Sequence, residues 1–197
     1  TRVAAELRQR VQRADPGFLR PVLREPVVTR EPAHERVHAR RVALDQRADE
    51  IGPDWSVNDV IVYEISPRRG GDIDIFTINS DGSSKTQLTD NRRQDVRASW
   101  SPDGTTFVFS RCGLESNCDL FTINTDGSGA TRVTDTRRRD EFGAHYSPDA
   151  RFFVFTGSRG EGTGDLFRMR TDGTRTRNLT NTPNRFEVDA DWQPLLP

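Results

Sequence analysis

The sequence predicts an all-β fold, a β-propeller, and three observations carry that prediction. An aromatic residue recurs at spacings of 45, 46 and 46 residues, at Trp55, Trp100, Tyr146 and Trp192. Short runs of β-branched and aromatic residues follow the first three of these anchors, as in Phe107-Val108-Phe109. Only 32% of the 197 residues are hydrophobic, which suits short strands joined by polar loops. A fixed period of this length is typical of propellers, solenoids and other repeat arrays.

Each repeat divides into four expected strands, the first of which leads into the aromatic anchor. The second strands are expected at 60–65, 107–111 and 152–156, the third at 73–79, 119–124 and 165–170, and the fourth at 85–89, 131–134 and 176–180. Asp-Gly turns precede each fourth strand, with glycine supplying the positive φ. Four antiparallel strands per repeat is the composition of a propeller blade.

The turn after the second anchor is Ser101-Pro102-Asp103-Gly104, and it has a clear physical basis. Proline presets the φ of the second turn position, aspartate bonds back to nearby backbone, and glycine takes the left-handed position. Ala150 stands where the next repeat should have glycine, so we expect strain or a changed turn there, at a cost of about 1 kcal/mol.

The repeats predict the domain boundaries. Three blades are expected near 51–95, 96–141 and 142–187, with a closing strand at Val188–Gln193. Residues 18–50 are either a degenerate fourth blade or a linker, because prolines interrupt their short apolar runs. Residues 1–17 are either a short helix, with Val3, Leu7 and Val11 on one stripe, or a solvated tail. A closing strand that pairs with the N-terminal segments would make a small four-bladed ring.

Trp-Ser-Pro-Asp-Gly, Phe-Val-Phe-Ser and the following Asp-Leu-Phe-Thr-Ile-Asn-x-Asp-Gly together resemble the TolB-type WD40-like (PD40) β-propeller repeat. The resemblance covers about residues 42–197. It implies a periplasmic or extracellular propeller that binds proteins or other ligands. It does not fix function, since one fold serves many functions.

Composition and motifs exclude several classes of function. The formal net charge of −1 gives no global field that would favour nucleic acid. No run of 18 apolar residues is present, so no membrane span is expected. Phosphate loops, dinucleotide fingerprints and the Gly-x-Ser-x-Gly elbow are absent from the sequence. We therefore expect no cofactor and no metal site.

Cys112 and Cys118 are the only cysteines, and they flank the hairpin between the second and third strands of the middle repeat. The two ends of such a hairpin lie close enough for a disulfide, which would fit an oxidising compartment. The alternative is a pair of exposed thiols.

A carboxylate stands five residues before each anchor, and arginines precede each of these acids. The acids are Glu50, Asp95, Glu141 and Glu187. The arginines two or three positions before them are Arg47, Arg92, Arg93, Arg138, Arg139 and Arg185, and of these Arg92, Arg138 and Arg185 are expected beside the acids. Equal offsets place these residues at equivalent points of successive blades, around one mouth of the propeller channel. They form either a ring that binds a charged ligand or one capping ion pair per blade.

Two functions of different class follow. The first is a non-catalytic module that binds a protein or peptide through charged loops at this mouth. The alternative is an enzyme or enzyme accessory acting on polysaccharide or peptide. It depends on the acids and on His145, which immediately precedes Tyr146 near the expected inner strand. A solvated or hydrogen-bonded histidine is the simpler interpretation of His145.

Overall fold

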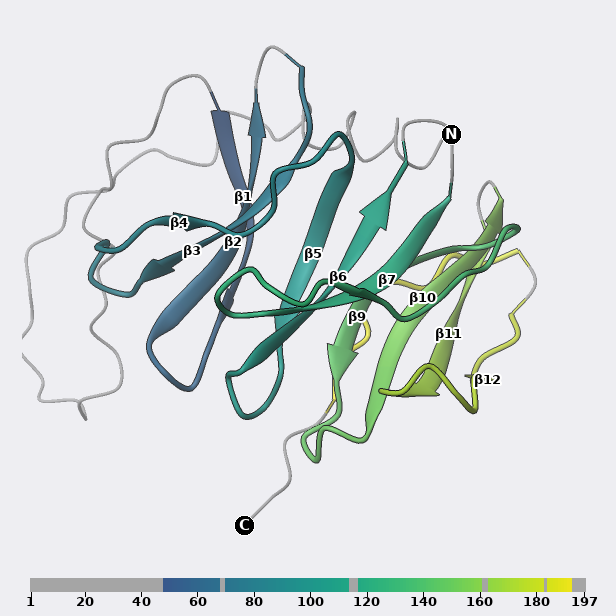
Figure 1. Cartoon of the computed structure of the whole chain (residues 1–197). Helices are drawn as coiled ribbons and strands as arrows, with labels where there is room; N and C mark the ends of the chain where they lie inside the picture. The colour runs from purple at the N-terminus through teal and green to yellow at the C-terminus, as the bar shows by residue number, and fades with distance from the viewer. Residues whose placement is uncertain (1–47, 68–69, 114–116, 161–162, 183, 193–197) are drawn as a thin grey trace, which may run out of the picture.

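The computed structural model describes residues 48–67, 70–113, 117–160, 163–182 and 184–192. These residues form three four-stranded antiparallel sheets, each made of four consecutive strands. The sheets follow one another side by side in chain order, as the blades of a propeller do (Figure 1). The predicted all-β architecture with three clear blades is therefore confirmed.

The strand bounds agree with the periodic pattern, although the fourth strands are shorter than expected. Blade 1 comprises β1 (Ala48–Trp55), β2 (Val60–Pro67), β3 (Asp74–Asn79) and β4 (Thr86–Gln87). Blade 2 comprises β5 (Gln94–Trp100), β6 (Thr106–Cys112), β7 (Cys118–Asn124) and β8 (Thr131–Arg132). Blade 3 comprises β9 (Asp140–Tyr146), β10 (Phe152–Gly160), β11 (Thr163–Arg170) and β12 (Arg177–Asn178).

The hydrophobic core lies between blades rather than within them. Val62 and Ile75 of blade 1 pack in one cluster with Trp100 and Phe109 of blade 2. A second cluster joins blades 2 and 3, with Val108, Leu120, Phe153, Phe155 and Met169 among its members. A single blade has no other surface on which to bury its apolar face, so each one depends on its neighbour.

The aromatic anchors tie each repeat to the previous one, which explains their period. Trp100 Nε1 donates to the carbonyl of Asp54 at 3.2 Å, and Trp192 Nε1 donates to the carbonyl of His145 at 3.3 Å. The Tyr146 hydroxyl instead bonds the Thr106 hydroxyl at 3.1 Å. In each case the indole N–H or phenol hydroxyl bonds a residue of the preceding blade, and the aromatic ring remains free to pack against apolar neighbours.

The tight turns keep one geometry in blades 2 and 3. Gly104 has φ 68° and its N–H donates to Ser101 O at 2.9 Å, whereas Ala150 has φ 55° and donates to Ser147 O at 2.8 Å. The turn is therefore unchanged at Ala150, and the left-handed conformation is imposed on a residue with a Cβ. The expected backbone strain is present in this geometry.

The chain end packs on blade 3 without adding a strand. Phe186 forms an isolated parallel bridge with Gly164, and Glu187 N donates to Gly164 O at 2.9 Å. Residues 187–192 have irregular backbone, so the strand predicted at 188–193 is not formed over its described part. The predicted N-terminal helix and the degenerate blade at 18–50 lie almost entirely outside the described residues, and the fourth blade is not confirmed. Among the described residues, no helix is long and apolar enough to cross a membrane.

Candidate ligand-binding site

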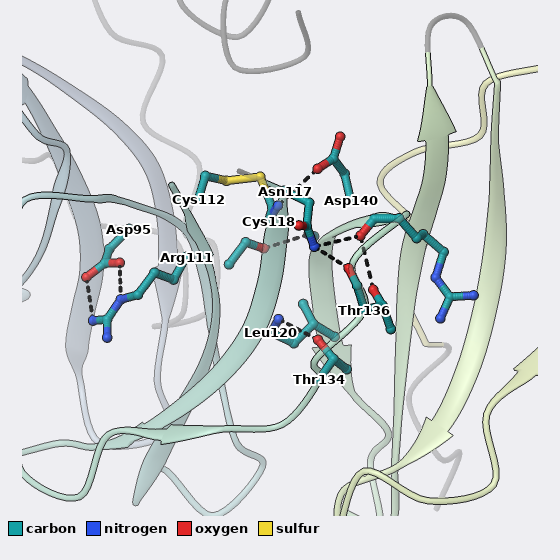
Figure 2. The surroundings of a disulfide bond; sticks show 12 residues. Asp95, Arg111, Cys112, Asn117, Cys118, Leu120, Thr134, Thr136 and Asp140 are labelled. Atoms are coloured by element: carbon teal, nitrogen blue, oxygen red, sulfur yellow. Dashed lines mark hydrogen bonds and ion pairs between the residues drawn. A yellow bond between two sulfur atoms is a disulfide. The ribbon is translucent and has the colours of Figure 1, made fainter. Parts of the chain in front are cut away.

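Three of the predicted acids, Glu50, Asp95 and Glu141, lie at equivalent places on the first strands of the three blades, and each is engaged inside its own blade. Glu187 lies in the irregular segment that follows blade 3. In blade 2, Arg111 Nε and Nη2 contact the two oxygens of Asp95 at 2.7 and 2.8 Å. Asn91 adds a third bond at 2.7 Å to a carboxylate that is fully buried. The guanidinium carbon of Arg111 lies 4.7 Å from the centre of the Phe121 ring (Figure 2 shows the Asp95–Arg111 pair). Arg111 thus contacts a carboxylate and lies over an aromatic ring, and this combination of carboxylate, cation and ring will be called a stack.

Blade 3 builds the same stack from a different position. Arg139 Nε and Nη2 contact Glu141 Oε1 at 2.9 and 2.7 Å, and its guanidinium carbon lies 4.5 Å from the centre of the Phe167 ring. Gly157 faces Glu141 across the strands, just as Arg111 faces Asp95. A Cβ at Gly157 would stand 2.8 Å from Arg139 Cδ, so glycine here leaves the space that the Arg139 side chain fills.

Blade 1 uses a lysine. Lys85, in the turn before β4, places Nζ 3.7 Å from Glu50 Oε1 and 5.3 Å from the centre of the Phe76 ring. This pair is more exposed than the other two, with 41% of the Lys85 side chain and 29% of the Glu50 side chain accessible. Glu187 differs again, because its Oε1 accepts a bond from the Thr182 hydroxyl at 3.0 Å.

The cations beside the acids are thus Lys85, Arg111 and Arg139. The three arginines predicted beside the acids, Arg92, Arg138 and Arg185, are exposed, and none forms an ion pair with another residue of the described ranges. Sequence reasoning missed Arg111 although a signal existed, since it lies directly opposite Asp95 in the hairpin register. The role of the acids and of these arginines in ligand binding stays a prediction.

The two ends of the blades carry opposite exposed charge. The end at which β5 and β9 begin will be called the arginine end, and its exposed arginines are Arg92, Arg93, Arg137, Arg138, Arg159 and Arg185. Glu50, Asp90 and Asp135 are also exposed there; Glu50 is paired with Lys85 at 3.7 Å and Asp135 with Arg132 at 2.9 Å. Because Asp95 and Glu141 are buried in their stacks, arginine dominates the exposed charge at this end among the described residues.

The opposite, aspartate end is formed by the tight turns. Its exposed acids are Asp59, Asp81, Asp103, Asp126, Asp149 and Asp172, against the exposed Arg151 and Arg175. The Ser101 hydroxyl and the Thr105 backbone and hydroxyl bond Asp103 and lower the pKa of its carboxyl. Equivalent serine or threonine bonds lower the pKa of Asp81, Asp126, Asp149 and Asp172. These turn carboxylates therefore remain ionised near neutral pH.

A disulfide lies at the arginine end. Cys112 and Cys118 face each other across the β6–β7 hairpin and are bonded, and both are buried against Val96 (Figure 2). The next residues toward blade 3 are tied down as well: Asn117 Nδ2 donates to the carbonyls of Thr136 and Arg139, and Cys118 N donates to Asp140 Oδ1 at 3.0 Å. The hairpin of blade 2 therefore holds the loop that leads into blade 3.

His145 directly precedes its aromatic anchor, and it lies beside residues that directly precede other anchors, namely Ser99 and Asp191. Its Nδ1 is 3.2 Å from Ser99 Oγ and 3.8 Å from Asp191 Oδ1, and the Ser99 hydroxyl donates to Asp54 Oδ2 at 3.1 Å. A Ser-His-Asp relay needs serine and aspartate on different ring nitrogens. Here both face Nδ1, and the serine proton is directed at Asp54, so the arrangement orients the imidazole and does not activate Ser99.

Two further channel-side residues escaped sequence reasoning. Arg97 Nη1 contacts Asp189 Oδ1 at 2.6 Å and its guanidinium carbon lies 5.4 Å from the Phe142 ring centre. Arg97 and Asp189 both have left-handed backbone, at φ 56° and 57°, as do Gly52 and Gly143 at the equivalent points of the other repeats. Only glycine gives a sequence signal for that conformation, so the two charged members of the set were not visible. Among the described residues, no group of three His, Cys, Asp or Glu side chains is arranged to hold a metal ion.

A family model of the TolB beta propeller domain, PD40, matches residues 36–185, which is most of the chain. The chain belongs to the PD40 family. No curated protein matches its sequence.

Solved structures agree with this PD40 assignment at the level of the fold. The putative TolB of Agrobacterium tumefaciens superposes with a TM-score of 0.57 at 21% identity, over 66% of this chain and 48% of that one. TolB of Acinetobacter baumannii gives 0.58 at 20% identity, over 70% and 34%. A puromycin hydrolase gives 0.57 at 14% identity, over 71% and 23%. The chain thus spans about half the length of the first TolB structure and about a third of the second.

Proposed function

We propose that this PD40 propeller is a non-catalytic binding module that docks an acidic segment of a protein or peptide at its arginine end. The observation that carries the proposal is the separation of exposed charge between the two ends of the blades. The family resemblance supports protein binding, and the disulfide supports a periplasmic or extracellular location.

The buried stacks explain why the exposed charge at this end is positive. Asp95 and Glu141 each take up one guanidinium and are both fully buried, so a ligand at the surface meets few free carboxylates there. The remaining arginines project from the loops before β5 and β9, from the end of β10 and from the segment before Glu187. Charge gathered at one mouth focuses the local potential and speeds the encounter with an oppositely charged partner.

The test is a fluorescence anisotropy titration with a labelled octaglutamate peptide, and labelled octalysine as the matched probe. We expect saturable binding of octaglutamate that weakens as salt rises, whereas octalysine, which the aspartate end attracts, should keep its affinity when arginines of the arginine end are replaced. Arg92→Glu combined with Arg185→Glu should weaken octaglutamate binding at least tenfold, because it replaces two attractive charges by repulsive ones.

Arg175→Glu, at the aspartate end, is the control and should leave octaglutamate binding within twofold of wild type. Equal losses for the control and the double variant would mean that only net charge matters, which contradicts docking at one end. Absence of saturable octaglutamate binding, or a loss of octalysine affinity in the double variant as large as that of octaglutamate, would also refute the proposal.

A further inference from the structure

A depression of about 750 Å³ opens between blades 2 and 3 at the arginine end. Its lining residues are Thr136, Arg137, Arg138, Arg139 and Arg159. Four cations line one hollow, and they come from two separate elements, the β8–β9 loop and strand β10. This clustering differs from the scattered arginines elsewhere at the same end.

Only one of the four guanidiniums is neutralised within the described chain. Arg139 is held on Glu141 and over the Phe167 ring, so its position is fixed. Arg137, Arg138 and Arg159 are exposed and form no ion pair with any residue that the structure describes. Like charges this close repel one another, and an anion that contacts several of them at once relieves that repulsion.

The loop that carries Arg137 and Arg138 is anchored on both sides. Asn117 bonds the carbonyls of Thr136 and Arg139, and the Cys112–Cys118 disulfide secures the hairpin from which Asn117 projects (Figure 2). Within the loop, the Thr136 hydroxyl donates to Arg139 O at 3.1 Å, and Thr136 N donates to Asp119 Oδ1 at 3.2 Å. A loop held in this way loses little conformational entropy when it binds a ligand.

We infer that the depression is a binding site for a phosphate-type oxyanion, preorganised by the disulfide hairpin of blade 2. Guanidinium groups match phosphate oxygens in pairs, and arginine is favoured wherever such bidentate recognition occurs. A single carboxylate would leave two of the three free charges uncompensated, whereas a di- or trianion compensates most of them. The site is separate from Arg92 and Arg185, on which the test of acidic-segment docking depends.

The experiment is an isothermal titration of the whole chain with inorganic pyrophosphate, and with acetate as the singly charged comparison. We expect one saturable site per chain for pyrophosphate and none for acetate. Arg138→Ala and Arg159→Ala should each weaken pyrophosphate binding about tenfold, the effect of one lost charge-assisted contact. Arg177→Ala, an exposed arginine on the outer strand of blade 3, removes the same charge elsewhere and should change the affinity less than twofold.

A further variant tests whether the bonds from Asn117 hold the arginine loop in position for binding. Asn117→Ala should weaken pyrophosphate binding several-fold at unchanged stoichiometry, and its melting temperature without ligand shows whether the fold is retained. An unchanged affinity in folded Asn117→Ala would refute the positioning role of the hairpin. Binding without saturation, or an equal loss in Arg177→Ala, would refute the site itself.

A second arm identifies the source of the phosphate. Vesicles of phosphatidic acid in phosphatidylcholine, compared with phosphatidylcholine alone, test a lipid headgroup. Cosedimentation that pyrophosphate displaces indicates a headgroup, and pyrophosphate binding without cosedimentation indicates a free or small-molecule phosphate. Both outcomes support the oxyanion site, whereas octaglutamate binding that is lost in Arg138→Ala as strongly as pyrophosphate binding would overturn the assignment to phosphate.

Discussion

Each of the three blades places a cation beside the acid of its first strand, but the cation comes from a different segment in each blade. In blade 2 the cation Arg111 stands in the strand directly opposite the acid, whereas in blades 1 and 3 it comes from a turn, as Lys85, or from a loop, as Arg139. In all three, the cation contacts a carboxylate of the first strand and lies over the ring of a third-strand phenylalanine. The blade geometry therefore specifies where a cation is needed but not which segment supplies it.

The contact between successive blades shows a second difference. At equivalent points of the second strands, Ser110 Oγ accepts a bond from Gly143 N of blade 3 at 3.3 Å, and the Thr156 hydroxyl donates to Glu187 O at 3.0 Å. Blade 1 has Glu64 at this point, and its Oε1 accepts from Ala98 N of blade 2 at 3.1 Å. A buried carboxylate thus stands at the junction of blades 1 and 2, where a hydroxyl stands at the junction of blades 2 and 3 and at the contact between blade 3 and the segment that follows it.

We expect the largest effect at the ion pair of blade 2, in which the Asp95 carboxylate is fully buried and Arg111 is partly exposed. Arg111→Ala leaves the Asp95 carboxylate buried without its cation, and we expect a loss of about 3 to 5 kcal/mol in the free energy of unfolding. Chemical denaturation monitored by tryptophan fluorescence measures that loss. Arg92→Ala, an exposed arginine at the same end, should change stability by less than about 0.5 kcal/mol. A loss below 1 kcal/mol in Arg111→Ala would show that the stack is not a source of stability.

The stability of the junction between blades 1 and 2 should depend on pH, because Glu64 titrates there. Burial raises the pKa of Glu64 from 4.5 to about 7, against the opposing effect of bonds from the Ala98 and Arg97 N–H groups. The pKa of Glu64 is higher in the folded state than in the unfolded state, so protonated Glu64 favours folding. This stabilisation is complete below pH 4.5 and is lost as the pH rises to about 7. The difference between the two pKa values corresponds to roughly 3 kcal/mol in the free energy of unfolding.

Glu64→Gln keeps the shape and an accepting oxygen but does not ionise. We expect it to be more stable than wild type at pH 8, and the difference between the two proteins to shrink toward zero at pH 4.5. Denaturation curves at both pH values make the comparison, with Ser110→Ala as a variant of the neighbouring junction that adds no titration. A difference that does not vary with pH would contradict the raised pKa.

The sequence predicted the three sheets because turns and aromatic anchors recur with a local physical reason in every repeat. Glu50, Asp95 and Glu141 lie at equivalent positions of β1, β5 and β9, since equal offsets from the anchors give equal positions, whereas Glu187 lies in irregular backbone. Arg139 is one of the arginines that precede the acids in the sequence, and the space left by Gly157 lets it reach Glu141. Arg111 and Lys85 could not be identified in this way, because they come from a neighbouring strand and a distant turn. The Ser99–His145 contact was equally hidden, since it joins residues of two blades and depends on how those blades pack.

A smaller effect on stability is expected at the tight turns of blades 2 and 3, which have different residues at the same position. Ala150 adopts φ 55° where blade 2 has Gly104, so Ala150→Gly should relieve left-handed strain and stabilise the protein by about 0.5 to 1 kcal/mol, after the entropy of the added glycine is deducted. Gly104→Ala should do the reverse, because alanine at φ 68° would be in the left-handed region that glycine adopts without strain. Thermal unfolding of both variants is the measurement, and a destabilising Ala150→Gly would mean that the strain is relieved in another way.

The smallest effect is expected at Lys85, the only lysine of the chain, and it is the sharpest test of whether the three stacks are equivalent. Its contact with Glu50 is long, at 3.7 Å, and both side chains are partly exposed, so solvent screens the attraction. Removing an ion pair of this kind usually costs less than about 1 kcal/mol, and its position over the Phe76 ring adds only a few tenths more. Lys85→Ala should therefore lower the free energy of unfolding by less than about 1 kcal/mol, with most of that loss abolished in high salt. A salt-independent loss as large as that of Arg111→Ala would show that exposure does not weaken the stack of blade 1, and the contrast between blade 1 and blade 2 would then fail.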